Sequence, residues 1–417
     1  MKKLVIVLTL LLVILFTPSS STLAKAGEEV SEVNSYKNVI MFIGDGMGPN
    51  HVDAAGIYLG EPLCFDSFND KWTYHAYSNT DSLTSAGFTL DTTKSLLRPE
   101  ENKTLYDGTP SPYDSSVSLG ASGNITTYTD SAAGGTALAT GVKVTNSRIG
   151  MDIEGNAIEN LTEIAKSLNK KTGVISSDEI TGATPSTFLV HVPARYESEM
   201  ILNQVATSKA DLILTKKCSD YKNNKATYDA LYSQNGFTVV NEEIELNKDS
   251  DKIIGLFNGI SPFDDPRMPS LAELTIFALD YLDNEEGFFL MVEGANIDKQ
   301  SHSNQTKLMM NELLGFNEAV KAAEEWANGR DDTLIVVTAD HETGGLYYNR
   351  NSASQTTILT DIKWLSQNHS RTRVDIAVYG DISSFVSKFG HNFTTLEGLP
   401  YWDNTDIFRL CSWYLTH

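Results

Sequence analysis

Asp45, Glu293 and Asp340 each follow within two residues of a short apolar run of the kind that forms a buried strand. The three runs are 38–43, 288–292 and 333–338. In open α/β sheets, ligands bind beyond the carboxyl ends of the strands, so we expect these carboxylates to converge there. A single Asp in such a place is more simply a solvated turn residue. Three acids after three strands are typical of a functional site.

Asp298 and His302 are four residues apart. If a helix begins near Ile297, this spacing places both side chains on one face, where they could bind one metal ion. For this pair alone, a plain surface Asp/His contact is the simpler interpretation. His341 and His369 supply further imidazoles, however, and oxygen and imidazole ligands without thiolates favour a catalytic Zn²⁺ site with open positions.

A candidate nucleophile, Ser131, stands in the segment T-D-S-A-A-G-G-T-A-L-A-T at 129–140. We interpret this segment as a strand end that turns into an Ala-rich helix, with Ser131 in the first helical turn. Asp130 or Ser131 could serve only to cap that helix. The free N–H groups and the positive end of the helix dipole would also attract a phosphoryl group.

The elements that must position these residues alternate between strand-like and helix-like patterns. This alternation predicts an α/β fold with a mostly parallel central sheet and helices on both faces. Predicted strands are 38–43, 172–176, 211–214, 288–292, 333–338 and 373–379, and predicted helices are 131–140, 158–169, 271–283 and 308–327. Polar stretches at 91–127, 216–250 and 343–368 are predicted to be insertions or loops within one domain, 27–417.

The first 26 residues have the pattern of a signal peptide. Met1-Lys2-Lys3 is followed by an apolar run at 4–16 and by Ala24-Lys25-Ala26, a small-residue cleavage pattern. An uncleaved anchor is the alternative. No later stretch approaches ~20 uninterrupted apolar residues, so we expect no membrane span after cleavage and a secreted or periplasmic protein.

The composition narrows the classes of partner. A formal net charge of -22 disfavours nucleic-acid binding. It also opposes an anionic substrate unless bound cations reverse the local field, which again points to metals. The three cysteines, Cys64, Cys218 and Cys411, show no CxxC spacing and allow one disulfide at most.

Six motifs in order along 38–409 resemble those of the alkaline phosphatases. They are I-G-D-G-M-G at 43–48, T-D-S-A-A-G-G-T-A at 129–137, A-T-P at 183–185 with Arg195 downstream, E-G-A-N-I-D-K-Q-S-H at 293–302, T-A-D-H-E-T-G-G at 338–345 and N-H-S at 368–370.

The resemblance implies three sets of metal ligands. A first Zn²⁺ would be held by Asp298, His302 and His369, a second Zn²⁺ by Asp45, Asp340 and His341, and a Mg²⁺ by Asp45, Thr184 and Glu293. It also implies that Ser131 is the catalytic nucleophile, that Arg195 grips two phosphate oxygens and that Asp130 orients Arg195. The expected activity is hydrolysis of small phosphate monoesters through a phosphoserine, followed by attack of water.

Four features depart from the family pattern. Gly182 stands where relatives carry Asp or His, so we expect a weakly held Mg²⁺ that Gly182→Asp would strengthen. The alternative is that Lys299 or a shifted loop replaces this ion altogether. Thr343 replaces a His that supports the zinc ligands in some relatives, and Thr215-Lys216-Lys217 replaces a Gly-rich turn. The insertion at 343–368 is a small crown, and larger crowns help dimerisation, so a homodimer is only a secondary expectation.

Two other functions remain open from the sequence. A phosphodiesterase of the same superfamily would usually present Thr as nucleophile, and a sulfatase needs a Cys-x-Pro-x-Arg type of site, which neither Cys64 nor Cys218 provides. A secreted protein that only binds metal or phosphate could use the same carboxylates and histidines. It would have no need for Ser131 preceded by Asp130.

Overall fold

The computed structural model describes residues 36–66, 72–79, 128–263, 265, 267–370, 372–389, 393–394 and 400–417. The chain divides into the units Met1–Val33 and Asn34–His417, and all described residues belong to the second. The predicted signal peptide and the insertion at 91–127 lie outside the described residues. Within the described part, no helix is both long and apolar enough to cross a membrane.

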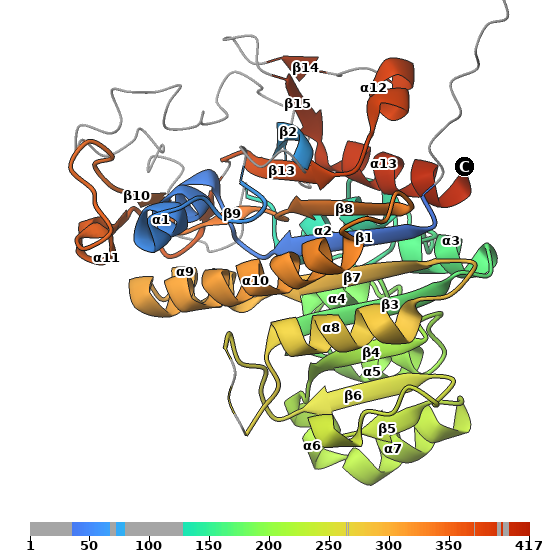
Figure 1. The fold of residues 1–417 in the computed structure, drawn as a ribbon. Helices are drawn as coiled ribbons and strands as arrows, with labels where there is room; N and C mark the ends of the chain where they lie inside the picture. The colour runs from blue at the N-terminus through green and yellow to red at the C-terminus, as the bar shows by residue number, and fades with distance from the viewer. Residues whose placement is uncertain are drawn as a thin grey trace, which may run out of the picture. The chain divides into compact units, whose positions relative to one another are not determined.

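The described residues form one sheet of eleven strands in the order β14-β15-β2-β13-β8-β1-β7-β3-β4-β6-β5 (Figure 1). The strands from β8 to β5 run parallel, and β13 is antiparallel to both of its neighbours. Their bounds are β1 Asn38–Gly44, β2 Trp72–Asn79, β3 Lys171–Glu179, β4 Leu212–Lys216, β5 Thr238–Val240, β6 Ile253–Phe257, β7 Phe288–Gly294, β8 Thr333–Thr338, β13 Val374–Tyr379, β14 Phe393–Thr394 and β15 Pro400–Asp403.

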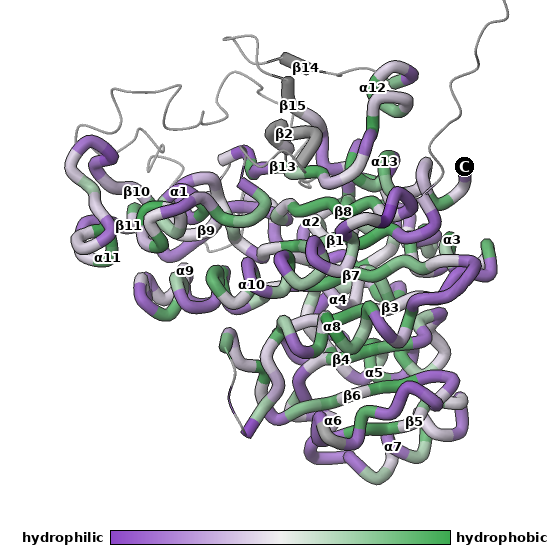
Figure 2. Tube along the Cα trace, viewed as in Figure 1, coloured by the Kyte–Doolittle hydropathy of each residue, from purple (hydrophilic) through white to green (hydrophobic). Residues whose placement is uncertain are grey.

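The central strands are mostly apolar because both of their faces are covered. Every residue of β1 is buried, as expected for a parallel strand between two helical layers. Ile40 and Phe42 pack on one face, and Val39 and Met41 pack on the other. Figure 2 shows the hydrophobic colour concentrated along these strands.

The helices lie in two layers (Figure 1). The layer over Ile40 and Phe42 contains α1 Pro49–Leu59, α8 Leu271–Leu282 and α10 Thr306–Ala327. The opposite layer contains α2 Ser131–Thr140, α3 Leu161–Ser167, α5 Ser198–Val205 and α13 Asn404–Thr416. The predicted α/β fold, with a mostly parallel sheet and helices on both faces, is therefore confirmed.

The strand register aligns the ends that carry the predicted site. Ile43 on β1 pairs with Glu293 on β7 and with Thr338 on β8. Ser176 on β3 pairs with Glu293 from the other side. The acids that follow β1 and β8 therefore leave the sheet at the same edge as Glu293.

The prediction for 216–250 was wrong where it expected a loop. This segment contains α6 Ser219–Asn223, α7 Lys225–Gln234 and β5, which pairs with β6 at the edge of the sheet. Its core is aromatic: the rings of Tyr221, Tyr228 and Tyr232 stack on one another. Tyr has a low hydropathy, so in a polar segment its helical spacing does not stand out as the buried face of a helix.

Other elements were not anticipated, including α1, β6 and α13. The strand end expected before Ser131 is also absent, since residues 128–130 have no strand structure. The small crown at 343–368 consists of short pieces: β9 Glu342–Thr343, β10 Leu346–Tyr347, α11 Ile358–Asp361 and β11 Lys363–Trp364, with β12 His369–Ser370 just beyond. All three cysteines are free.

Candidate active site

Asp298, His302 and His369 form the first of two clusters of metal-ligand type, with one potential ligand atom from each within 4.8 Å of the others. Asp298 and His302 lie on α9 Asn296–His302, where the i,i+4 spacing brings Asp298 Oδ1 to 3.3 Å from His302 Nε2. His369 comes from β12, and its Nε2 is 3.6 Å from Asp298 Oδ1. Helix α9 and strand β12, which follows the crown, thus meet at this cluster.

The hydrogen bonds of these two histidines leave their Nε2 atoms free to bind a cation. His302 Nδ1 lies 2.5 Å from the carbonyl oxygen of Gln367, and His369 Nδ1 lies 2.6 Å from that of Thr129. Because a carbonyl can only accept, each Nδ1 must carry the proton. The two Nε2 atoms then face each other 3.1 Å apart, where one cation could bind both.

Asp45, Asp340 and His341 form the second cluster, which is fully enclosed. Asp340 Oδ1 accepts the backbone N–H groups of Gly46 and His341 at 3.2 and 3.0 Å. Asp340 Oδ2 and Asp45 Oδ1 have no hydrogen-bond partner, yet they lie 3.3 and 3.5 Å from His341 Nε2. Unpartnered buried oxygens around an imidazole nitrogen fit a bound cation.

Burial and close approach of like charges shift the pKa values of the residues in this cluster when no cation is bound. Burial, followed by the charge of Asp298, raises the pKa of Asp340 to about 7. Burial and the neighbouring Asp340 raise the pKa of Asp45 well above its ordinary value. Burial lowers the pKa of His341 and of His369, which keeps both imidazoles neutral and able to act as ligands.

Ser131 begins α2 and lies beside the second cluster. Its side chain is buried, and its Oγ is 3.2 Å from His341 Nε2. Asp130 caps the helix by accepting the N–H of Ala133 at 3.0 Å. The helix start therefore holds a hydroxyl, free N–H groups and a ligand cluster in one place, which suits binding of a phosphoryl group.

Arg195 is joined to the same helix start through Asp130. Arg195 Nη1 lies 3.2 Å from Asp130 Oδ2, which also accepts the N–H of Ser147 at 2.9 Å. The backbone N–H of Arg195 in turn donates to the carbonyl of Ser147 at 2.7 Å. Asp130 therefore fixes Arg195 relative to Ser131, and it does so in addition to capping the helix.

The family resemblance implies a third set of ligands, Asp45, Thr184 and Glu293. Asp45 Oδ1, Thr184 Oγ1 and Glu293 Oε1 are all buried without a hydrogen-bond partner. Ser176 Oγ donates to the other oxygen of Glu293. Burial first, and then the charge of Asp178, raises the pKa of Glu293 to about 8. Unpartnered hard oxygen atoms are the donor type that Mg²⁺ prefers.

The sequence analysis missed residues that support these clusters. Thr343 Oγ1 donates to Asp298 Oδ1 at 2.5 Å and lies 3.3 Å from His341 Nδ1, so it links the two clusters. Glu342, which is buried, accepts a hydrogen bond from Ser370 Oγ next to His369. The sequence analysis identified position 343 as one where some relatives carry a His that supports the zinc ligands, but it did not predict these contacts of Thr343.

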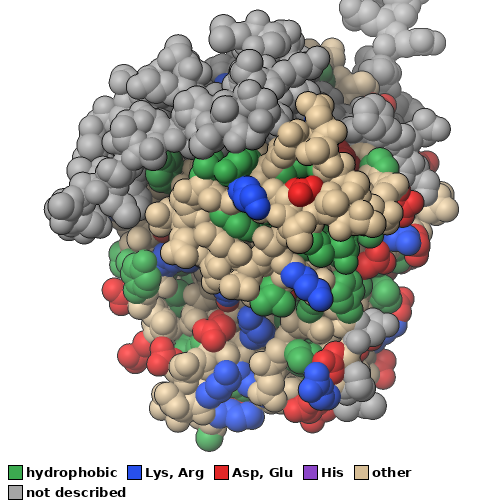
Figure 3. All heavy atoms as spheres, turned by 90° about the vertical axis from the view of Figure 1, so that its left-hand side faces the viewer, with side chains coloured by type: hydrophobic (Ala, Val, Ile, Leu, Met, Phe, Trp, Pro, Cys, Tyr) green, Lys and Arg blue, Asp and Glu red, His purple; other side chains and the backbone are tan. Residues whose placement is uncertain are grey.

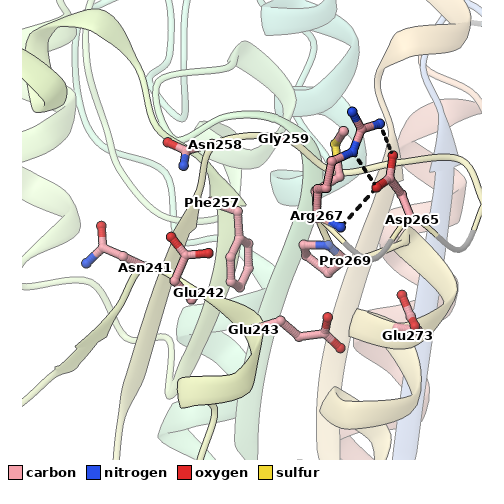
Figure 4. Close-up of a pocket in the computed structure, with 11 residues that line it drawn as sticks. Asn241, Glu242, Glu243, Phe257, Asn258, Gly259, Asp265, Arg267, Pro269 and Glu273 are labelled. Carbon is pink, nitrogen blue, oxygen red and sulfur yellow. Dashed lines mark hydrogen bonds and ion pairs between the residues drawn. The ribbon is translucent and has the colours of Figure 1, made fainter.

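The described part of the surface on the face shown in Figure 3 carries side chains of both charges. Figure 3 shows Lys, Arg, Asp and Glu side chains interspersed on the face seen there. A separate pocket of about 590 Å³ lies beyond the ends of β5 and β6, and none of the site residues line it (Figure 4). It is lined in part by Glu242, Glu243 and Glu273, while Arg267 pairs with Asp265.

Comparisons with known structures agree with the fold. Alkaline phosphatase from an Antarctic bacterium, TAB5, aligns with a TM-score of 0.66 at 23% identity, covering 92% of this chain and 98% of that one. A variant of it with Mg bound in its M3 site aligns with a TM-score of 0.65 at 24% identity and the same coverage. The class is therefore an alkaline phosphatase-like α/β protein.

The sequence comparison is more specific. The profile of the alkaline phosphatase family matches residues 121–226 and 215–392. Alkaline phosphatase 4 of Bacillus subtilis is 33% identical over 339 residues, which cover 78% of this chain and 66% of that protein. This chain thus spans slightly less than two thirds of that relative. It belongs to the alkaline phosphatase family.

Proposed function

We propose that this protein hydrolyses small phosphate monoesters to an alcohol and inorganic phosphate, with Ser131 as nucleophile, at a site for two Zn²⁺ and one weakly held Mg²⁺. The observation that carries the proposal is the position of Ser131 Oγ, at a helix start and 3.2 Å from His341 Nε2 of a buried ligand cluster. A protein that only binds metal would not need a hydroxyl there.

The proposed reaction has two displacements. The Ser131 oxygen forms a bond to phosphorus as the bond from phosphorus to the alcohol breaks; Ser131 loses its proton and the alcohol gains one. Water then bonds to phosphorus while the bond to Ser131 breaks, which releases phosphate and returns a proton to Ser131. Zn²⁺ bound at the two clusters would lower the pKa of hydroxyl groups and offset phosphate charge.

Arg195 would select the terminal phosphate. Its planar guanidinium can donate to two phosphate oxygens at once, and Asp130 already holds it by one nitrogen. A monoester has free oxygens for this grip and a diester has fewer. Arg195 therefore favours monoesterase over phosphodiesterase activity.

Export and assembly complete the proposal. The N-terminal pattern supports removal of residues 1–26 and a secreted or periplasmic location. A homodimer is proposed from the family alone. Fractionation of cells that produce the full chain, with N-terminal sequencing of the product, tests the export step.

The test of activity uses purified protein, chromogenic phosphate monoester and diester substrates, and added or chelated zinc. Ser131→Ala should lower monoester turnover by at least ~10²-fold and leave folding and zinc content unchanged. Phosphate should be recoverable on Ser131 after an acid quench of the wild type. Ser233→Ala on α7 is the matched control. Wild-type turnover in Ser131→Ala would contradict the proposal.

A further inference from the structure

Gly182 precedes α4 Ala183–Thr187. A neighbouring side chain, and not the backbone conformation, excludes a larger residue at this position. Its φ of -55° and ψ of 145° are open to any residue. A Cβ at this position would stand 2.6 Å from Asp178 Oδ2 and 2.8 Å from Asp178 Cγ. The carboxylate of Asp178 thus fills the space into which a side chain at 182 would grow.

Asp178 cannot easily move out of that space. Its Oδ1 accepts the N–H of Glu179 at 2.7 Å and forms an ion pair with Lys299 on α9. Its backbone N–H donates to Ser176 Oγ at 2.8 Å. The side chain is only 15% exposed, so a rotation away would break these contacts in a partly enclosed place.

The same contacts connect Asp178 to the third group of ligands. Ser176 Oγ accepts from Asp178 and donates to one oxygen of Glu293, whose other oxygen has no partner. Thr184, two residues beyond Gly182, also has an unpartnered buried hydroxyl. Asp178 Oδ1 is committed to Glu179 and Lys299, which leaves Oδ2, the atom nearest Gly182, to accept a hydrogen bond from water.

We propose that Asp178 is a positioning residue for the Mg²⁺ site of Asp45, Thr184 and Glu293, and that it supplies from β3 the carboxylate that residue 182 cannot carry. The inference rests on the proposed function for that site. Mg²⁺ keeps several of its waters when bound, so a carboxylate can act through one of them. The expectation that Gly182→Asp alone strengthens Mg²⁺ binding is therefore replaced, because the new side chain would collide with Asp178.

The experiment measures Mg²⁺ affinity by calorimetry in zinc-loaded protein, independently of turnover. Asp178→Asn and Asp178→Ala should each weaken Mg²⁺ binding by ~10- to 100-fold, and Gly182→Asp alone should also weaken it. The double variant Asp178→Gly with Gly182→Asp moves the carboxylate from one position to the other and should recover affinity to within ~10-fold of wild type. Glu179→Gln, at the next residue, is the charge-matched control and should change little.

Unfolding curves check that each variant is folded. If either Asp178→Asn or Asp178→Ala fails to fold, the other one still provides the test. Unchanged Mg²⁺ affinity in Asp178→Asn and Asp178→Ala, tighter binding by Gly182→Asp alone, or no Mg²⁺ binding by the wild type would each overturn the role of Asp178. The wild type could also show no phosphatase activity while the variants still show the predicted Mg²⁺ affinities. This result would refute the proposed function but would leave the role of Asp178 in Mg²⁺ binding intact.

Discussion

At the scale of single residues, the histidines of the site are oriented by backbone atoms. Carbonyl groups of Gln367 and Thr129 accept from the Nδ1 atoms of His302 and His369. Each ring therefore carries a proton on Nδ1, and its Nε2 faces the other ring of the cluster. Such support usually matters for metal affinity nearly as much as the ligands themselves.

Removing either imidazole of the first cluster should release one metal ion. We expect His302→Ala and His369→Ala to reduce bound zinc from about two ions per chain to about one, because three protein ligands are the usual minimum of a catalytic site. Elemental analysis after dialysis measures this. His417→Ala, at the exposed C-terminus, serves as control. Two tightly held zinc ions in both variants would show that the grouping is wrong.

Arg195→Ala should separate substrate binding from metal binding. The side chain is held by Asp130, and we assign it to the substrate and not to the metal ions, so zinc content should stay at the wild-type level. Inhibition by inorganic phosphate should weaken by ~10-fold or more, since a bidentate charged contact is lost. Inhibition constants and metal content are the readouts, with Arg409→Ala on α13 as control. A loss of zinc in Arg195→Ala would place this residue in metal binding instead.

At the scale of elements, the site depends on how closely α2 approaches the segment after β8. Gly134 lies one turn from Ser131, and a Cβ there would stand 2.8 Å from the backbone oxygen of Asp340. That oxygen cannot retreat without moving the carboxylate of the second cluster. The small residues of α2 therefore set the separation between Ser131 and His341.

Gly134→Ala should push α2 away from Asp340, with a destabilisation of about 1–3 kcal/mol from overpacking and a loss of turnover. Gly56→Ala in α1 is the matched control, since its new methyl group would meet only ordinary contacts. Ala is favoured over Gly inside a helix, so that variant should gain roughly 0.5–1 kcal/mol. Denaturant unfolding of both proteins gives the comparison. Equal stabilisation of the two variants would rule out the tight approach.

At the scale of the whole molecule, buried negative charge is concentrated where the strands end. The chain carries a formal net charge of -22, and this total includes Asp45, Asp340 and Glu293, which are buried. Burial is the largest cause of the raised pKa of each of these carboxyls. Bound cations would neutralise this region, so fold stability and metal content should be linked.

The metal-free protein should lose stability as the pH rises. Asp340 and Glu293 have folded pKa values of about 7 and about 8, above their values of ~4 in the unfolded chain. Between these limits the folded state holds more protons than the unfolded state, so the free energy of unfolding falls until the pH exceeds the folded values. In zinc-loaded protein the carboxylates are ligands, and the slope should be much smaller.

Thermal unfolding with chelator and with zinc, at about pH 6 and about pH 8.5, tests this dependence. The difference in unfolding midpoint between zinc-loaded and chelated protein should be larger at the higher pH. Asp340→Asn combined with chelator should reduce the slope. If the wild type with chelator is equally stable at both pH values, Asp340 and Glu293 do not have raised pKa values in the metal-free protein.

The sequence alone determined the parts of this protein that depend on neighbouring residues. Apolar runs such as 333–338 identify buried strands because both faces of a parallel sheet are covered. The four-residue step from Asp298 to His302 places both on one helix face, as α9 shows. Motifs around Asp45 and Ser131 indicated the alkaline phosphatase family, and the family profile confirms this membership.

Tertiary structure decided what depends on residues far apart in the chain. The helices of 216–250 are stabilised by stacked tyrosines that hardly differ from polar residues in a hydropathy pattern. The bond from Thr343 to Asp298 spans two elements, and no spacing rule predicts it. Gly182 looked like a lost ligand until the fold placed the Asp178 carboxylate in its space. Local patterns report which face a residue occupies, whereas only packing determines which distant side chain it meets there.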